Sequence, residues 1–106
     1  MSEIFDIASQ YARHLATRQG LIANNIANAN TPGFTPQDAM PFSIDNIGSA
    51  KMENSVDRPQ AETLHSGNGV DLDQELHAAW EVTRNYTLNN AITKAFHRIA
   101  LATIKA

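Results

Sequence analysis

A run of asparagines inside a helical pattern is the feature that most constrains this chain. Residues 21–34 read Leu-Ile-Ala-Asn-Asn-Ile-Ala-Asn-Ala-Asn-Thr-Pro-Gly-Phe, with four asparagines within seven positions. Asparagine is a mediocre helix former because its amide competes for local backbone hydrogen bonds. Ile22, Ile26 and Ala29 nevertheless keep helical spacing through the polar cluster. The stretch therefore predicts an amphipathic helix whose amides have a purpose other than helix formation.

The end of this helix is predicted at the sequence Thr31-Pro32-Gly33. Proline presets φ for the second position of a turn, and glycine supplies the positive φ that the third position of a type II turn needs. Asn30, just before the turn, fits a helix C-terminal position, where asparagine tolerates the left-handed conformation. The chain is thus expected to leave the helix abruptly and enter a loop.

The other three asparagines, Asn24, Asn25 and Asn28, have two interpretations. Asn28 could simply be a helix C-terminal residue, like Asn30. We favour hydrogen bonds across a packed helix interface for all three, because a polar residue in a helix seam fixes register at a cost in stability.

Two long helices are predicted to flank an irregular middle, in a single all-α domain of residues 1–106. Residues 2–30 form the first, and residues 71–105 form the second, with Asp71 as its N-cap. Residues 31–70 contain all four prolines and four of the five glycines, which predicts a loop with one short extended piece around residues 40–47. The two helices are expected to pair as an antiparallel hairpin or coiled coil.

The apolar content is small for a self-sufficient core. Hydrophobic residues make up 42% and aromatic residues 7% of the 106 residues, and a hairpin of two amphipathic helices has little else to bury. The surplus apolar residues of the second helix are what we expect if neighbouring subunits complete the core. The predicted assembly interface comprises Leu21, Ile22, Asn24, Asn25, Ile26, Asn28, Thr31, Pro32, Gly33 and Phe34 of the asparagine-rich motif, with Leu72, Leu76, Trp80, Tyr86, Phe96 and Ile99. Gly20, in the middle of the first helix, indicates either a tolerated weak spot or the close approach of another helix.

Composition and motifs argue against several classes of function. A net charge of -3 gives no general reason to bind nucleic acid or anionic lipid, and the lack of cysteine excludes a disulfide framework. No apolar run approaches the ~20 residues that span a bilayer, and the first residues lack the basic region of a signal peptide.

No catalytic, metal or cofactor site is expected. The four histidines, at positions 14, 65, 77 and 97, include no pair one helical turn apart, as a helical zinc site requires. Asp71, Asp73 and Glu75 alternate as in a calcium loop, but its sixth and twelfth positions hold Leu76 and Val82. No nucleophile elbow surrounds any loop serine, so an enzyme is not expected.

The asparagine-rich stretch of residues 21–34 resembles the N-terminal signature of flagellar axial proteins, and among them of the basal-body rod proteins. Residues 67–75, Gly-Asn-Gly-Val-Asp-Leu-Asp-Gln-Glu, resemble the start of the C-terminal helix in the proximal rod proteins. Asn85-Tyr86 and Lys94-Ala95-Phe96 also resemble that helix. The start of this helix and the short C-terminal tail favour a proximal rod protein other than FlgC, which shares the asparagine-rich signature. Residues 35–66 match nothing in the family, and this middle is shorter than expected.

The resemblance implies a structural subunit of the bacterial flagellum, not an enzyme. Such proteins are exported by the flagellar type III export apparatus without cleavage of a signal peptide, and they polymerise through their terminal helices into the rod that crosses the periplasm and supports motility. The implied partners are further copies, other rod proteins of the FlgC and FlgF type, the adaptor FliE and the MS ring, with no nucleic acid and no membrane insertion. The alternative is a helical-hairpin adaptor or chaperone-like binding module that never polymerises.

Overall fold

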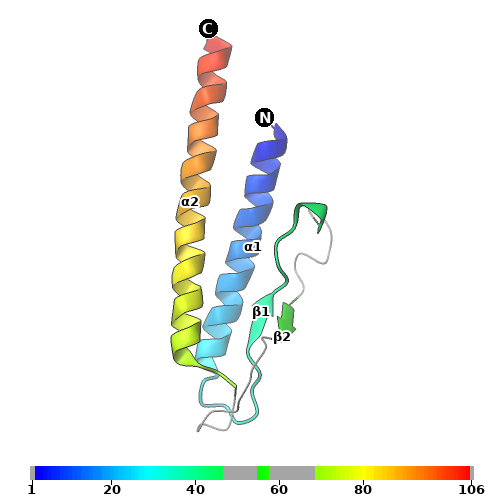
Figure 1. The fold of residues 1–106 in the computed structure, drawn as a ribbon, viewed down its shortest axis with the longest axis vertical. Coiled ribbons are helices and arrows are strands. Elements are labelled where there is room, and N and C mark those ends of the chain that lie inside the picture. The colour runs from blue at the N-terminus through cyan, green and yellow to red at the C-terminus, as the bar shows by residue number, and fades with distance from the viewer. Residues whose placement is uncertain (1, 47–54, 58–68, 106) are drawn as a thin grey trace.

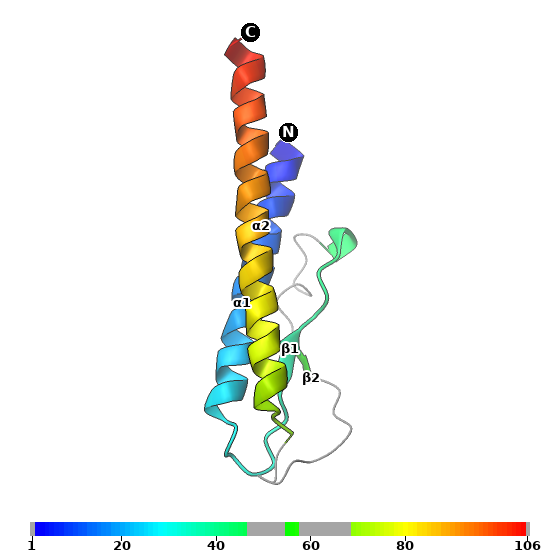
Figure 2. The same ribbon diagram turned by 60° about the vertical axis from the view of Figure 1, so that its left-hand side comes forward.

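The computed structural model describes residues 2–46, 55–57 and 69–105. Two long helices, α1 (Ser2–Ala27) and α2 (Leu72–Lys105), lie side by side and run antiparallel (Figure 1; Figure 2). Three short elements lie between them in sequence: β1 (Gln37–Ala39), the 3-10 turn η1 (Ile44–Asn46) and β2 (Ser55–Asp57). The predicted all-α helical hairpin is confirmed.

The first helix ends at Ala27, not at the predicted residue 30. The N–H of Ala29 donates to the carbonyl of Ile26 over 3.2 Å, which tightens the last turn. The predicted type II turn follows: the N–H of Phe34 donates to the carbonyl of Thr31 over 3.2 Å, and Gly33 has φ of 76°. The asparagine-rich stretch therefore begins as helix and finishes as a series of turns.

The second helix begins as predicted. Oδ1 of Asp71 accepts hydrogen bonds from the N–H groups of Asp73 and Gln74, at 3.0 and 3.4 Å. These bonds satisfy two of the N–H groups that the first turn of a helix leaves without a partner. With Leu72–Lys105 helical throughout, α2 is eight residues longer than α1 (34 against 26).

The middle of the chain contains more regular structure than a plain loop. Strands β1 and β2 pair antiparallel, with Asp38 opposite Val56. The predicted extended piece around residues 40–47 is misplaced, because the strand is Gln37–Ala39 and Ile44–Asn46 is a 3-10 turn; residue 47 lies outside the described residues. Pro41, just after β1, has no N–H to donate to a ladder.

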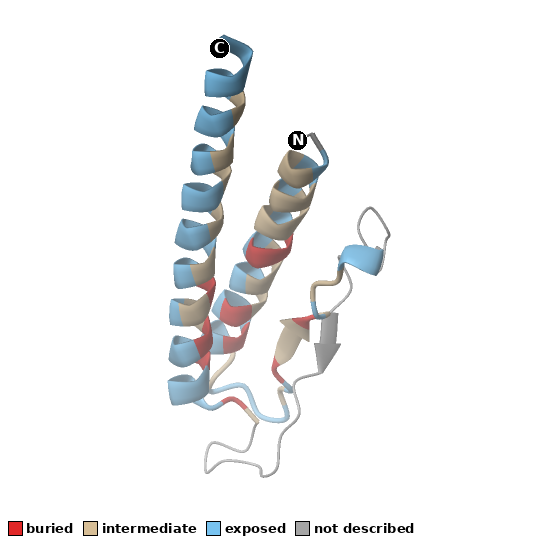
Figure 3. Cartoon of the chain, turned by 45° about the horizontal axis from the view of Figure 1, so that its top comes forward, coloured by how far each residue is buried: buried red, intermediate tan, exposed pale blue. Residues whose placement is uncertain are grey.

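The hydrophobic core lies where the two helices meet near their connected ends (Figure 3). Four buried residues form it, Leu15 and Ile22 from α1 with Ala78 and Val82 from α2. A fully buried aliphatic side chain contributes roughly 1.5–3 kcal/mol, so a core of this size supports only a marginal fold.

The face of α2 that meets α1 does not include Leu76 or Trp80 of the predicted assembly interface. Glu75, Ala78 and Val82 are buried, whereas Leu76 and Trp80 are 61% and 59% exposed. Residues four apart form one row along a helix, so the row through Leu76 and Trp80 runs beside the seam rather than in it. The large apolar side chains of α2 are thus left outside the hairpin.

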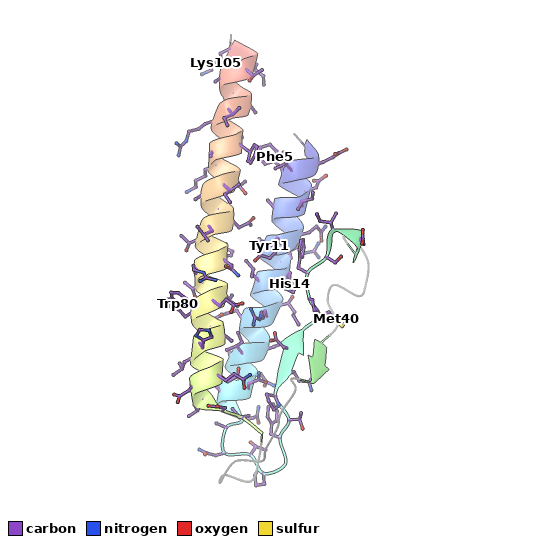
Figure 4. The ribbon with its side chains drawn as sticks, in the orientation of Figure 1. Phe5, Tyr11, His14, Met40, Trp80 and Lys105 are labelled. Atoms are coloured by element: carbon purple, nitrogen blue, oxygen red, sulfur yellow. The ribbon has the colours of Figure 1, made fainter. Side chains whose placement is uncertain are left out.

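The helix register leaves the end of α2 unmatched by α1. Nδ2 of Asn89 donates to the carbonyl of Ala8 over 3.0 Å. Phe5 points toward α2 (Figure 4), and its ring centroid lies 6.2 Å from that of His97. Since α1 begins only three residues before Phe5, residues 98–105 project beyond it (Figure 1). We call these residues the α2 overhang. Neither α1 nor α2 is long and apolar enough to cross a membrane.

Candidate assembly interface

Asn25 joins three segments of the chain near the connected ends of the two helices. Its Nδ2 donates to the carbonyl of Gln37 over 2.8 Å and to Oε2 of Glu75 over 3.2 Å. Its Oδ1 accepts from the N–H of Gln37 over 3.0 Å. Asn25 and Glu75 are both 0% exposed. One amide therefore holds β1 and α2 against α1, so Asn25 bonds across the packed interface between the two helices.

An ion-pair triad makes a second connection among the same three elements. Nε of Arg18 on α1 donates to Oδ1 of Asp38 on β1, and its Nη1 donates to Oε1 of Glu81 on α2, both over 3.0 Å. Burial alone would lower the pKa of Arg18, but the hydrogen bonds to Glu81 and Asp38 outweigh it and raise the pKa. Sequence analysis did not identify this triad, because Arg18 and Glu81 are 63 positions apart and no local pattern relates them.

An aromatic cluster makes the third connection, between α1 and the segment after β1. The ring centroid of Phe42 lies 5.0 Å from that of Tyr11 and 5.6 Å from that of His14. Figure 4 labels Tyr11 and His14 on α1. Nδ1 of His14 is buried and has no hydrogen-bond partner among the described residues. Burial, followed by the nearby positive charge of Arg18, lowers the pKa of His14 below its usual 6.5, although Asp38 opposes the shift.

The predicted motif residues separate into three groups. Ile22 and Asn25 are buried within the hairpin. Asn24 and Asn28 bond to each other, since Nδ2 of Asn28 donates to the Asn24 carbonyl over 2.8 Å. Among the described residues no residue other than glycine has a positive φ, so neither Asn28 nor Asn30 adopts the left-handed conformation expected at a helix end. Half-buried or exposed positions hold the rest: Leu21, Ile26, Thr31, Pro32, Gly33 and Phe34.

Ile26 does not occupy the helix seam that its spacing predicts. Its side chain is 37% exposed, and Asn25 takes the buried position instead. The reason is chemical: the amide of Asn25 can satisfy the buried carboxylate of Glu75 and the backbone of Gln37, which an isoleucine side chain cannot. Ile26 is left on the outer surface of α1.

Helix α2 carries most of the exposed large apolar side chains of the described chain. Of the predicted interface residues on α2, only Phe96 is half-buried; the other five are among the exposed ones. The full set on α2 is Leu72, Leu76, Trp80, Tyr86, Leu88, Ile92, Ile99, Leu101 and Ile104, each at least 42% exposed. Apolar exposure of this extent along one helix is typical of surface that other proteins cover.

Arg84 covers part of Trp80 rather than pairing with Glu81. Its Cζ lies 5.0 Å from the centroid of the Trp80 ring, in cation-π geometry. Glu81 pairs with Arg18. Residues three apart on a helix, such as Glu81 and Arg84, can form an ion pair. The Glu81 carboxylate instead accepts a hydrogen bond from Arg18 of α1.

An open groove runs between the two helices. Its volume is about 380 Å³, and its lining contains no charged residue: Leu15, Ala16 and Gln19 of α1 with Val82, Thr83, Tyr86 and Thr87 of α2. We call it the α1–α2 groove. Arg18, which binds Asp38 of β1, and its other partner Glu81 are not part of this lining.

Comparison with known proteins identifies the family. A profile described as "Flagella basal body rod protein" matches residues 13–35, which include the whole asparagine-rich stretch. The flagellar basal body rod protein FlgB of Agrobacterium fabrum is 33% identical over 125 aligned residues, covering 97% of this chain and 93% of that protein. The match confirms the predicted resemblance to rod proteins, and to FlgB within them. The chain belongs to the flagellar basal-body rod protein family, and it is a structural subunit of the basal-body rod.

Proposed function

We propose that the chain polymerises into the rod through the exposed apolar surface of α2, together with the outer surface of α1 at Ile26. The observation that carries this proposal is the exposure of large apolar side chains along α2, from Leu72 at 48% to Ile104 at 80%. Burial of apolar surface is worth roughly 25 cal/mol per Å², so covering these side chains supplies the stability that the small hairpin core lacks.

The finer assignments follow from the family. Other flagellar rod and basal-body components are partners of such a subunit. We propose further copies of the chain, FlgC, FlgF-type rod proteins, FliE and the MS ring as its neighbours, in the periplasm. We also propose export through the flagellar type III apparatus, for which a marginally stable hairpin is suited because it unfolds at little cost in free energy.

A matched pair of substitutions tests the interface. Leu76→Asp places a charge on the exposed surface of α2, and Ile44→Asp makes the same change at a similarly exposed isoleucine on η1, at 61% and 68% exposure. Leu76→Asp is expected to abolish swimming and basal-body assembly, whereas Ile44→Asp retains both. Normal rods with Leu76→Asp would show that this surface is not buried in the assembly.

A further inference from the structure

Two features of the hairpin, the α2 overhang and the α1–α2 groove, are accessible to another molecule. The α2 overhang projects past α1 with Ile99, Leu101 and Ile104 at 58%, 42% and 80% exposure. The α1–α2 groove offers an uncharged hollow of about 380 Å³ near the middle of the hairpin. Each presents apolar surface to water, the overhang as a projecting helix end and the groove as a hollow between two helices.

The overhang cannot reach the groove of its own chain. Thr87 is the groove residue nearest to the overhang along α2, and Leu101 lies roughly 21 Å farther along the same straight helix at 1.5 Å per residue. The two surfaces can therefore meet only between different copies of the chain.

The chemistry of the two surfaces matches. Residues 99–104 read Ile-Ala-Leu-Ala-Thr-Ile, a stretch without a charged side chain between Arg98 and Lys105. Burying an unpaired charge costs far more than burying apolar surface, so an uncharged groove selects an uncharged helix segment. Beside the groove, a Cβ added at Gly20 would meet nothing within 4 Å, so nothing described crowds α1 there. The two basic residues that bracket the stretch can remain in water at the rim.

We propose that the α2 overhang of a second copy docks in the α1–α2 groove, an inference that rests on the proposed polymerising function. The donor and acceptor surfaces differ, so the contact is heterologous and each copy can give one overhang and receive another. Repeated heterologous contacts build a ring or an open helical polymer rather than a closed dimer. The arrangement thus assigns a direction to the assembly, from the end of one α2 to the middle of the next hairpin.

Cysteine cross-linking tests this contact, because the chain has no cysteine of its own. A variant with Thr83→Cys and Ile104→Cys carries one thiol at the groove and one on the overhang. The two positions are roughly 31 Å apart along one helix, whereas a disulfide needs Cα atoms within ~7 Å, so an intrachain bond is excluded. The variant replaces the wild-type protein in the source bacterium, and basal bodies are isolated after mild oxidation. Two control variants pair Ile104→Cys with Leu76→Cys on the outer row of α2, or with Ile44→Cys on η1.

The expected result is covalent oligomers of this chain alone, identified by mass, in the isolated basal bodies. The yield should be about tenfold above either control pair, since only the groove pair brings the Cα atoms within disulfide range. Basal bodies that contain the variant chain but yield the Leu76 product, a cross-link to a different protein, or no product would overturn the docking assignment and leave the rod function intact. Absence of the wild-type chain from isolated basal bodies would instead overturn the proposed function, and this inference with it.

Discussion

Asn25 and Glu75 meet between the two helices with neither side chain exposed: Nδ2 of Asn25 donates to Oε2 of Glu75 over 3.2 Å. A buried carboxylate is tolerated only where polar groups satisfy it. The same amide also forms two hydrogen bonds to the backbone of Gln37, which draws strand β1 onto the hairpin. Asn25 thus connects α1, α2 and β1 through one side chain.

Replacing Asn25 should therefore be costly. Asn25→Leu keeps a similar volume but leaves buried polar groups of Glu75 and Gln37 without this partner, and we expect a loss of about 2–4 kcal/mol in the free energy of unfolding. Urea titration followed by circular dichroism measures it, with trimethylamine oxide added to support a marginal fold. Asn24→Ala, at an exposed position of the same helix, should change the free energy by about 0.5 kcal/mol or less. Equal effects of the two substitutions would contradict the role assigned to Asn25.

His14 should make stability depend on pH. Its pKa is lowered in the fold by burial and by the charge of Arg18, so between the folded and unfolded pKa values the unfolded chain binds more protons. Stability is then fully present above the unfolded value near 6.5 and falls as pH drops through the folded pKa, by at most about 1.4 kcal/mol per pH unit. His14→Phe should flatten this pH dependence of the free energy of unfolding, measured by denaturation curves between about pH 7.5 and 5. His77→Gln, on the exposed side of α2, should retain it; an unchanged slope in His14→Phe would exclude His14 as the source.

Glycine-to-alanine substitutions at two sites should have opposite effects on the isolated chain. Gly20 is helical with open space around an added Cβ, so Gly20→Ala should raise the free energy of unfolding by about 0.5–1 kcal/mol. Gly33 has φ of 76°, so Gly33→Ala should lower it by about 1 kcal/mol. Thermal melts of both variants compare the two effects, and a destabilised Gly20→Ala would contradict the environment described for Gly20. Swimming of Gly20→Ala cells then distinguishes the two interpretations of Gly20. Loss of motility despite a more stable subunit indicates that another helix approaches Gly20 closely, whereas normal motility indicates a tolerated weak spot in α1.

Ile26→Asp should separate assembly from folding and export. The side chain is already 37% exposed in the subunit, so the hairpin should lose little stability. Assembly and motility should be lost, because the charge would be buried against a neighbour, while export continues because it does not require the folded interface. Soft-agar swimming and detection of the exported chain outside the cytoplasm measure the two outcomes. Rods that still form would show that Ile26 does not face a packed surface.

The helices and their ends could be predicted because their signals are local. Asp71 caps α2, and Pro32-Gly33 makes the type II turn, each through bonds within a few residues. The end of α1 at Ala27 lies three residues before the predicted residue 30, because apolar spacing alone cannot show that the backbone tightens there.

The tertiary connections could not be predicted, because they depend on which residues of distant segments meet. Apolar spacing placed Ile26 in the seam, whereas the buried position went to Asn25 once Glu75 and Gln37 offered partners. The Arg18 triad could not be predicted, because its bond to Asp38 depends on β1 packing against α1. The exposure of Trp80, Tyr86 and Ile99 could be anticipated, since the apolar residues exceeded what two helices can bury. Their role in assembly stays a prediction.

Sedimentation equilibrium across a concentration series, with circular dichroism on the same samples, tests the central claim most directly. If neighbouring copies complete the core, the mean mass should rise continuously with concentration, and helix content should rise with it. A fixed dimer at every concentration would favour a helical-hairpin adaptor that does not polymerise. A fully helical monomer that melts in one sharp transition would contradict the claim that assembly supplies the missing core.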